Sequence, residues 1–198
     1  MTFYPPKINE RFLHPQNAGE IENASAIGNG GSFVCGAALR IYLEIKDGKI
    51  VKAKFKAAGC GFLFASADVV CEKIVGEDFA EVGRKNPANA GMREEVFFER
   101  DFKHKFPANR THCLKLCLNA LRAAIDDYRS ARLESWNGDE ALICTCFGVA
   151  EKTIETTIVK NGLTTVEEVI DNCSAGGGCG ACQPLIMEIL EDVWRGAV

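Results

Sequence analysis

Two close cysteine pairs in the last third of the chain constrain its fold more strongly than any other feature. One residue separates Cys144 from Cys146, and two residues, Gly180 and Ala181, separate Cys179 from Cys182. Glycines crowd the second pair in CSAGGGCGAC at 173–182, where they allow the backbone to bend sharply or to approach a bound group. Two dithiol pairs supply the four thiolates of a metal site. We therefore expect the C-terminal region to fold around these cysteines.

The ten cysteines indicate metal or redox chemistry rather than a disulfide framework. The opening MTFYPPKINERF lacks the basic start and apolar run of a secretion signal, and no segment has the roughly 18 uninterrupted apolar residues of a membrane helix. We therefore expect a cytoplasmic protein without a membrane partner. The net charge of -4 and the lack of a long basic run argue against a nucleic-acid partner.

The first part of the chain predicts a β-hairpin followed by helices. Apolar and polar side chains alternate through 39–45 and again through 51–56, with the turn signal KDGK at 46–49 between them. The expected buried face carries Leu39, Ile41, Leu43, Ile45, Val51, Ala53 and Phe55, and the opposite face carries Lys52, Lys54 and Lys56. Helical spacing then appears at 65–74, and a long amphipathic helix is expected from Thr111.

Charge and periodicity divide the chain into two expected domains, 1–131 and 142–198, joined by a linker at 132–141. The first has 19 Lys and Arg against 16 Asp and Glu, whereas residues 141–198 have 3 against 8. The second domain predicts three helices: one ends at Gly162, one begins with Thr165 and Glu168 at capping-box spacing, and one has Pro184 in its first turn. So small a core would gain stability from a bound metal centre.

Three further cysteines lie at the expected ends of secondary-structure elements, where side chains can converge. Cys35 lies at the start of the first strand, Cys60 stands between two glycines after the second strand, and Cys113 follows His112 at a helix start. A helix N-terminus favours the nucleophilic thiolate. The remaining cysteines, Cys71, Cys117 and Cys173, read as packing residues, because free cysteine is usually a small buried apolar residue.

The motifs around these three cysteines resemble those of iron–sulfur cluster scaffold proteins of the NifU and IscU type. HPQNAGEIENA resembles the opening segment of that family, and VCGA, AAGCGF and THC match its three cysteine motifs in order. The resemblance implies an α+β fold in which an antiparallel sheet packs with helices. It also implies that Cys35, Cys60 and Cys113 build a transient 2Fe–2S or 4Fe–4S cluster. Cys113 would accept persulfide sulfur, and zinc could occupy the site in purified protein.

The C-terminal module resembles the small, mainly helical ferredoxin-like domain of NifU and the bacterioferritin-associated ferredoxins. The C-x-C pair, 32 intervening residues and the glycine-rich C-x-x-C pair carry this resemblance. It implies that Cys144, Cys146, Cys179 and Cys182 bind a permanent 2Fe–2S cluster. The chain would then be a scaffold rather than an enzyme. Its expected partners are a cysteine desulfurase, iron and electron donors, recipient apo iron–sulfur proteins and a second copy in a homodimer.

This sequence differs from the family at one position beside the site of Cys35, Cys60 and Cys113, which we call the open site. The first motif of the family normally reads Cys-Gly-Asp, but here Ala37 follows Gly36. Alanine cannot bind iron, so either His112 or an outside ligand would complete the site, and we expect a cluster that is held longer and transferred more slowly.

Three other functions remain compatible with the residues. Four cysteines also suit structural zinc, and the C-terminal cluster alone would make a 2Fe–2S electron-transfer protein without scaffold activity. A cysteine-nucleophile enzyme using Cys113 and His112 is a third possibility, although no nearby acid or oxyanion motif supports it.

Overall fold

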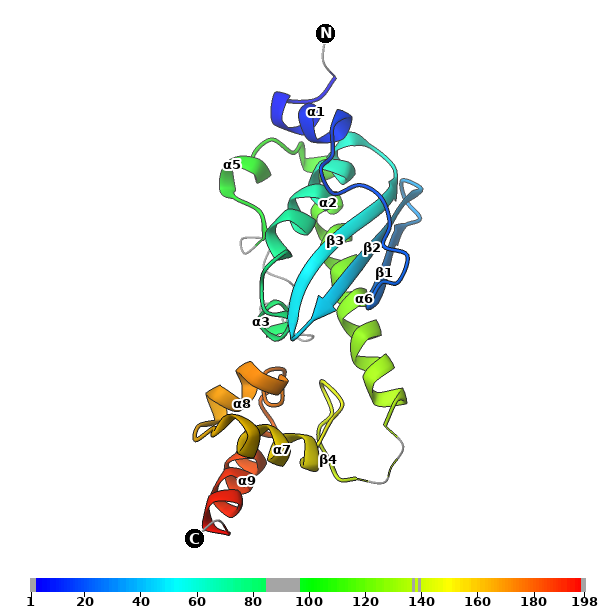
Figure 1. Cartoon of the computed structure of the whole chain (residues 1–198). Helices are drawn as coiled ribbons and strands as arrows, with labels where there is room; N and C mark the ends of the chain where they lie inside the picture. The colour runs from blue at the N-terminus through cyan, green and yellow to red at the C-terminus, as the bar shows by residue number, and fades with distance from the viewer. Residues whose placement is uncertain (1–2, 85–96, 137, 139, 197–198) are drawn as a thin grey trace. The chain divides into compact units, whose positions relative to one another are not determined.

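The computed structural model describes residues 3–84, 97–136, 138 and 140–196, and combines helices with antiparallel sheet (Figure 1). Its contacts separate two compact units. The first comprises Met1–Glu77 and Lys85–Tyr128, and the second comprises Asp78–Arg84 and Arg129–Val198. Among the described residues no helix is both long and apolar enough to cross a membrane.

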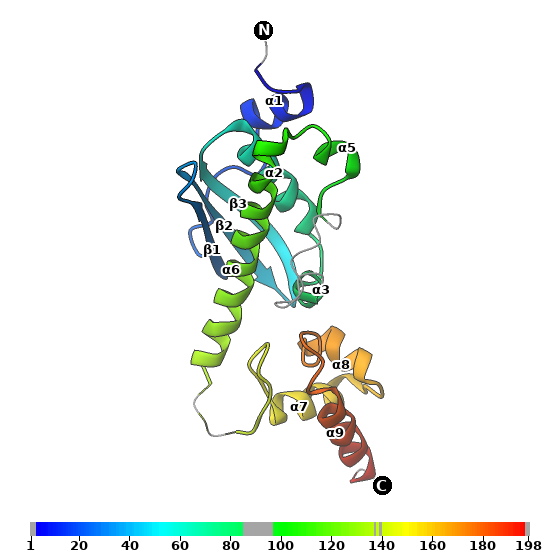
Figure 2. The same cartoon turned by 180° about the vertical axis from the view of Figure 1, so that it is seen from behind.

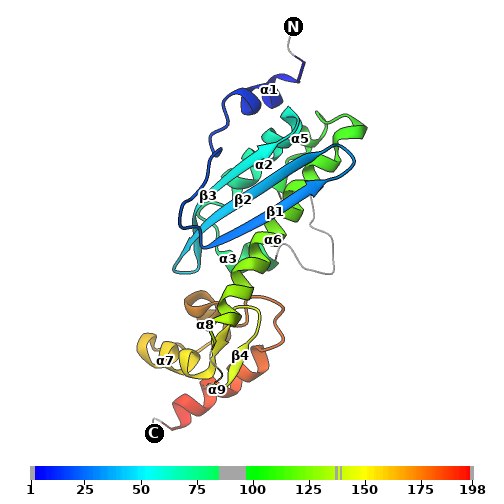
Figure 3. The same ribbon diagram turned by 90° about the vertical axis from the view of Figure 1, so that its right-hand side faces the viewer.

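The first unit contains a three-stranded antiparallel sheet in the order β1 (Ala26–Ser32), β2 (Ala37–Lys46), β3 (Lys49–Ala58). Its helical elements are α1 (Pro6–Leu13), α2 (Gly61–Ile74), α5 (Arg100–Lys103), the 3-10 turn η1 (Ala108–Arg110) and α6 (His112–Glu134). Figure 2 shows α2 and α6 over one face of the sheet, and Figure 3 shows the opposite face.

The predicted hairpin of β2 and β3 is confirmed, with two errors in its predicted buried face, since Ile45 is only partly buried and Val51 is exposed. Asp47 and Gly48 have φ of 49° and 73°, the left-handed conformation that a tight hairpin turn needs. Glu44 pairs with Lys52 but Ile45 pairs with Ile50, so Val51 is an extra residue that forms a β-bulge. The prediction that Val51 is buried is therefore wrong, because the bulge exposes it and buries Ile50 instead.

The glycine-rich strand β1 was not expected from the sequence, which shows no apolar alternation there. Its glycines let α6 lie directly on the sheet, since a Cβ atom on Gly28 would lie 1.9 Å from the carbonyl oxygen of Ala120. The Asp127 carboxylate of α6 also accepts a hydrogen bond of 2.8 Å from the backbone N–H of Ile27. This hydrogen bond joins α6 to the end of β1 where Ile27 pairs with Tyr42.

The N-terminal segment wraps onto α2 through a buried carboxylate. The side chain of Asp68 is fully buried, pairs with Arg11 and accepts a 2.9 Å hydrogen bond from the backbone N–H of Asn17. Arg11 also pairs with the exposed Glu72. These bonds hold α1 against α2 before the chain enters β1.

The second unit contains the small antiparallel pair β4 (Leu142–Cys144) and β5 (Val149–Ala150), followed by α7 (Glu151–Asn161), α8 (Val166–Cys173) and α9 (Gln183–Arg195). The three predicted helices are confirmed. Gly162 ends α7 with φ of 64°, Thr165 and Glu168 form a reciprocal capping box, and Pro184 lies in the first turn of α9.

The expected domain boundaries differ from the structure in two details. Helix α6 continues to Glu134, so the proposed linker at 132–141 begins as helix. Helix α3 (Phe79–Arg84) groups with the second unit, where the ring of Phe79 meets that of Phe147 edge-on at 6.0 Å between centroids. The sequence GRKNPANAG at 83–91, whose composition favours turns, lies mostly outside the described residues.

Candidate metal centres

The first unit brings Cys35, Cys60, Cys113 and His112 together from three places in the chain. Cys60 is the N-cap residue of α2, Cys113 is the second residue of α6, and Cys35 lies in the loop between β1 and β2. The Sγ atoms of Cys60 and Cys113 are 3.8 Å apart. The Nε2 atom of His112 lies 3.4 Å from Sγ of Cys35 and 3.7 Å from Sγ of Cys113.

The thiols of Cys35 and Cys113 have opposite environments. Cys35 is exposed, and hydrogen bonds with Ser32, the backbone of Ala37 and His112 lower its pKa to about 7. Cys113 is only 1% exposed, and burial, followed by its interaction with Cys60, raises its pKa to about 12. At neutral pH the thiolate is therefore concentrated at Cys35, on the outer side of the cluster of thiols.

The backbone around these cysteines is closely fitted. A Cβ atom on Gly59 would lie 3.3 Å from Cβ of Ala37, which brings the first two cysteine loops together. The backbone N–H of Gly61 donates a 3.1 Å hydrogen bond to the hydroxyl of Tyr4, and the Tyr4 ring leaves no room for a side chain at position 61. Tyr4 is not among the predicted site residues, although the glycines on either side of Cys60 indicate a close neighbour.

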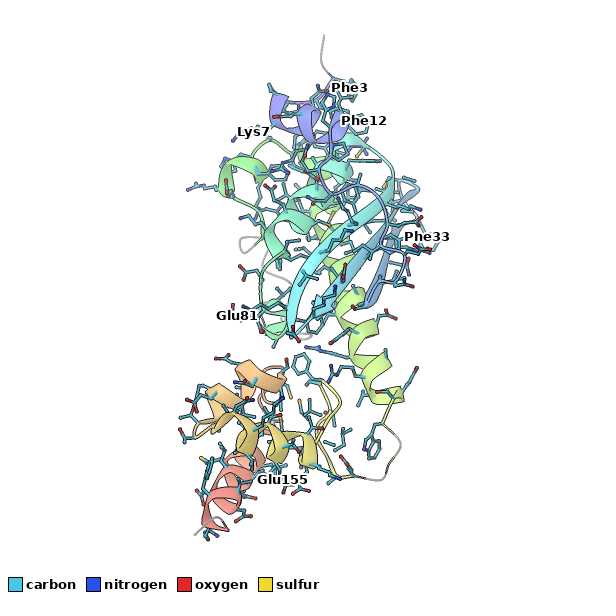
Figure 4. The ribbon with its side chains drawn as sticks, in the orientation of Figure 1. Phe3, Lys7, Phe12, Phe33, Glu81 and Glu155 are labelled. Atoms are coloured by element: carbon cyan, nitrogen blue, oxygen red, sulfur yellow. The ribbon has the colours of Figure 1, made fainter. Side chains whose placement is uncertain are left out.

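Ala37 has no side chain that could bind a metal ion. The loop that precedes it exposes two apolar side chains. Ala37 is 6% exposed, so its methyl group faces inward. Phe33 and Val34, immediately before Cys35, are fully exposed, and Figure 4 shows Phe33 pointing away from the sheet. A protein that reaches the Cys35 thiol would cover both side chains.

In the second unit, all four predicted cysteines line one small cavity of about 130 Å³. Cys144 ends β4, Cys182 is the N-cap residue of α9, and both are buried. Cys146 and Cys179 are more exposed, and their Sγ atoms are 3.5 Å apart. The loops thus place two buried and two accessible thiols around the same space.

The glycine run explains how the two cysteine loops approach each other. A Cβ atom on Gly178 would lie 2.7 Å from Cβ and 2.9 Å from Sγ of Cys146, closer than real side-chain atoms come. Hydrogen bonding from the backbone of Ala181 lowers the pKa of Cys179, whereas burial raises the pKa of Cys182 to about 12. Four thiols with backbone donors beside them are a donor set that fits a 2Fe–2S cluster.

In neither site are the described thiols arranged around a single metal ion. Among the described residues, no group of three or more histidine, cysteine, aspartate or glutamate side chains is arranged to hold one metal ion as it stands. Cys71 and Cys117 are fully buried, in keeping with a packing role, and Cys173 is half-buried and donates a 3.2 Å hydrogen bond to the carbonyl of Val169.

Comparison with known families confirms the resemblance seen in the motifs. Residues 3–135 match the family model described as the NifU-like N terminal domain, and residues 142–192 match that of the BFD-like 2Fe-2S binding domain. The chain belongs to the NifU-like family. The mixed helix and antiparallel sheet of the first unit, followed by a small 2Fe–2S-binding domain, is the fold that this membership predicted.

Individual relatives agree with this assignment. The nitrogen fixation protein NifU of Nostoc sp. is 35% identical over 206 residues, covering 98% of this chain and 65% of the relative. The NifU of Azotobacter chroococcum is 33% identical over 197 residues, covering 97% of this chain and 60% of the relative. An iron-sulfur cluster assembly scaffold protein IscU of Archaeoglobus fulgidus is 33% identical over 125 residues, covering 63% of this chain and 76% of that protein. The chain thus spans less than two thirds of the NifU relatives it matches.

Proposed function

We propose that this chain is an iron–sulfur cluster assembly scaffold. The observation that carries the proposal is the convergence of Cys35, Cys60 and Cys113 with His112, with Sγ to Nε2 or Sγ to Sγ distances of 3.4–3.8 Å. Three thiols and an imidazole can hold iron and sulfide at a surface that remains open on the Cys35 side. Such an open site suits a cluster that is built and then passed on.

The cavity lined by Cys144, Cys146, Cys179 and Cys182 would hold a permanent 2Fe–2S cluster. When bound, that cluster supplies one-electron storage. Buried Cys144 and Cys182 would anchor it to β4 and α9, while accessible Cys146 and Cys179 would leave one edge near solvent for electron exchange. The close fit of Gly178 against Cys146 would keep the two ligand loops at the spacing that four ligands need.

Sulfur would reach the open site as a persulfide from a cysteine desulfurase. We propose that Cys113 carries this sulfur, as the family resemblance implies. Because Cys113 is buried, we infer that the donor approaches by the exposed Cys35 loop, where Phe33 and Val34 offer apolar contact. Recipient apo iron–sulfur proteins would collect the finished cluster from the same side.

The remaining expectations about the setting of this protein are part of the same proposal. Ten cysteines with none in a described disulfide suit a reducing cytoplasm. Iron and electron donors would act as partners, and a homodimer is the expected assembly.

Anaerobic reconstitution with a desulfurase, cysteine and ferrous iron tests the proposal. The chain should take up iron and sulfide beyond those of one 2Fe–2S unit, and Cys35→Ser with Cys60→Ser should lose only the excess. Cys144→Ser with Cys146→Ser should lose the permanent cluster and keep uptake at the open site. A colourless zinc protein would support the zinc alternative, and uptake limited to one cluster would support a plain electron-transfer protein.

A further inference from the structure

Cys60 and Cys113 form a contacting thiol pair inside the open site. We propose that this pair supplies the two electrons that release sulfide from a persulfide on Cys113, with Cys60 as the attacking thiol, and that a protein dithiol afterwards reduces the pair. The proposal rests on the proposed function, because it concerns sulfur delivered to that site. It adds an activity, internal reductive sulfide release, to the binding role of these cysteines.

The geometry selects Cys60 among the neighbouring thiols. Its Sγ atom is 3.8 Å from that of Cys113, which is van der Waals contact between sulfurs. Cys60 is the N-cap residue of α2 and Cys113 is the second residue of α6, so both thiols belong to helix starts, where hydrogen bonds run from Leu63 N–H to the Cys60 carbonyl and from Leu114 N–H to the Thr111 carbonyl. A disulfide between them requires the sulfurs to close from 3.8 Å to about 2.0 Å.

The other nearby thiols are engaged elsewhere. The Cys35 thiol contacts His112 at 3.4 Å on the exposed side. Cys117 is one helical turn beyond Cys113, but its fully buried thiol points to the carbonyl of Leu63 at 3.9 Å. Cys117 therefore serves as a matched control on the same helix.

The chemical step balances within the site. The Cys60 thiol attacks the inner sulfur of the Cys113 persulfide, the bond between the two persulfide sulfurs breaks, and a Cys60–Cys113 disulfide forms. The outer sulfur leaves with the proton of Cys60 as hydrogen sulfide, so the two cysteines are oxidised as the sulfane sulfur is reduced. Hydrosulfide is a weaker base than an alkyl thiolate, which makes it the better leaving group. A protein dithiol reductant then reopens the disulfide with two electrons and two protons.

The test uses the full chain, kept anaerobic, free of iron at the open site and with its permanent cluster oxidised. Persulfide is loaded in one arm with inorganic polysulfide, removed by gel filtration, and in a second arm by a persulfidated desulfurase freed of cysteine. Released sulfide is counted, and the cysteines are mapped by peptide mass. Cys60→Ser keeps a favourable N-cap residue for α2, so the variant should fold.

In the polysulfide arm, only persulfide that maps to Cys113 is counted, because the exposed Cys35 thiol also takes up sulfur. The natural chain should release about one sulfide per Cys113 persulfide and gain a Cys60–Cys113 disulfide, whereas Cys60→Ser should keep its Cys113 persulfide and release sulfide at least about tenfold more slowly. Cys117→Ser should behave as the natural chain. A stable Cys113 persulfide in the natural chain, or equal release from Cys60→Ser, overturns the inference. Failure of the desulfurase arm alone would count against the proposed function and leave the result of the polysulfide arm to decide the inference.

Discussion

The Sγ atom of Cys35, in an exposed loop, lies 3.4 Å from Nε2 of His112, whereas Cys113, whose Sγ atom is 3.7 Å from the same nitrogen, is buried. Hydrogen bonds with Ser32, Ala37 and His112 lower the pKa of Cys35 to about 7, and burial raises that of Cys113 to about 12. We expect a limiting amount of iodoacetamide to alkylate Cys35 first in metal-free protein. The rate should fall about tenfold for each pH unit below 6, because the thiol becomes protonated, and level off above pH 8.

Peptide mass mapping measures this order. His112→Ala should raise the pKa of Cys35 only in part, since the hydrogen bonds with Ser32 and Ala37 remain. Preferential labelling of Cys113, or a rate that does not change through neutral pH, would contradict the assignment.

Substitution of Gly28 should disrupt the packing of β1 against α6. A Cβ atom there would lie 1.9 Å from the Ala120 carbonyl oxygen, which belongs to the helix backbone and cannot turn aside. We expect Gly28→Ala to lower the free energy of unfolding by at least about 2 kcal/mol. Gly31→Ala is the matched control, because its nearest atom would be 3.8 Å away, and it should change stability by no more than about 0.5 kcal/mol. Urea unfolding compares the two, and equal losses would show that the close approach is not what β1 requires.

Substitution of Gly178 should impair the second site specifically. Gly178→Ala would place a methyl group against Cys146 and force the ligand loops apart, so we expect loss of visible cluster absorbance in the purified protein. Gly180→Asn is the control, since Gly180 has φ of 79°, asparagine tolerates that conformation, and its Cβ would meet only Gln183, at 3.6 Å. A fully coloured Gly178→Ala variant would remove the proposed role of the glycine run.

Restoring the family acid at position 37 should make the transient cluster more labile. Ala37 cannot bind iron, whereas an aspartate there would add a carboxylate beside the Cys35 loop. We expect Ala37→Asp to shorten the lifetime of a reconstituted cluster and to speed its transfer to an apo-ferredoxin, followed by circular dichroism. Ala37→Asn has a similar size without the charge and should transfer more slowly than Ala37→Asp. Identical lifetimes in all three proteins would rule out a role for this position.

The buried carboxylate of Asp68 should stabilise the packing of the N-terminal segment against α2, which we call the N-terminal wrap. Asp68→Ala would leave the Asn17 N–H without its acceptor and the Arg11 guanidinium with only the exposed Glu72, at a cost of about 2–3 kcal/mol in unfolding free energy. Glu72→Ala removes only an exposed partner of Arg11 and should cost no more than about 0.5 kcal/mol. Thermal unfolding of both variants measures the difference, and a small loss for Asp68→Ala would mean that the wrap contributes little.

Local patterns predicted the parts of this protein in which neighbouring residues decide the structure. The hairpin turn at Asp47 and Gly48 and the capping box at Thr165 and Glu168 each depend on a few consecutive side chains, and both are confirmed. The cysteine motifs likewise led to the family. Strand β1 could not be found this way, because its glycines are explained by the distant backbone of α6.

The residues that surround the open site also could not be predicted from local sequence patterns. Nothing near Tyr4 indicates that its hydroxyl meets the N–H of Gly61, 57 residues away. The single-residue bulge at Val51 reversed the expected exposure of one strand end, since alternation alone does not reveal an inserted residue.

The hydrogen bond between Tyr4 and Gly61 has a practical consequence for the biochemist. A polyhistidine affinity tag joined ahead of Phe3 would be tethered beside the Cys60 thiol, where its imidazoles could chelate iron or zinc on their own account. Metal counts on such a fusion would then mix two sources, and cleavage of the tag before analysis would separate them.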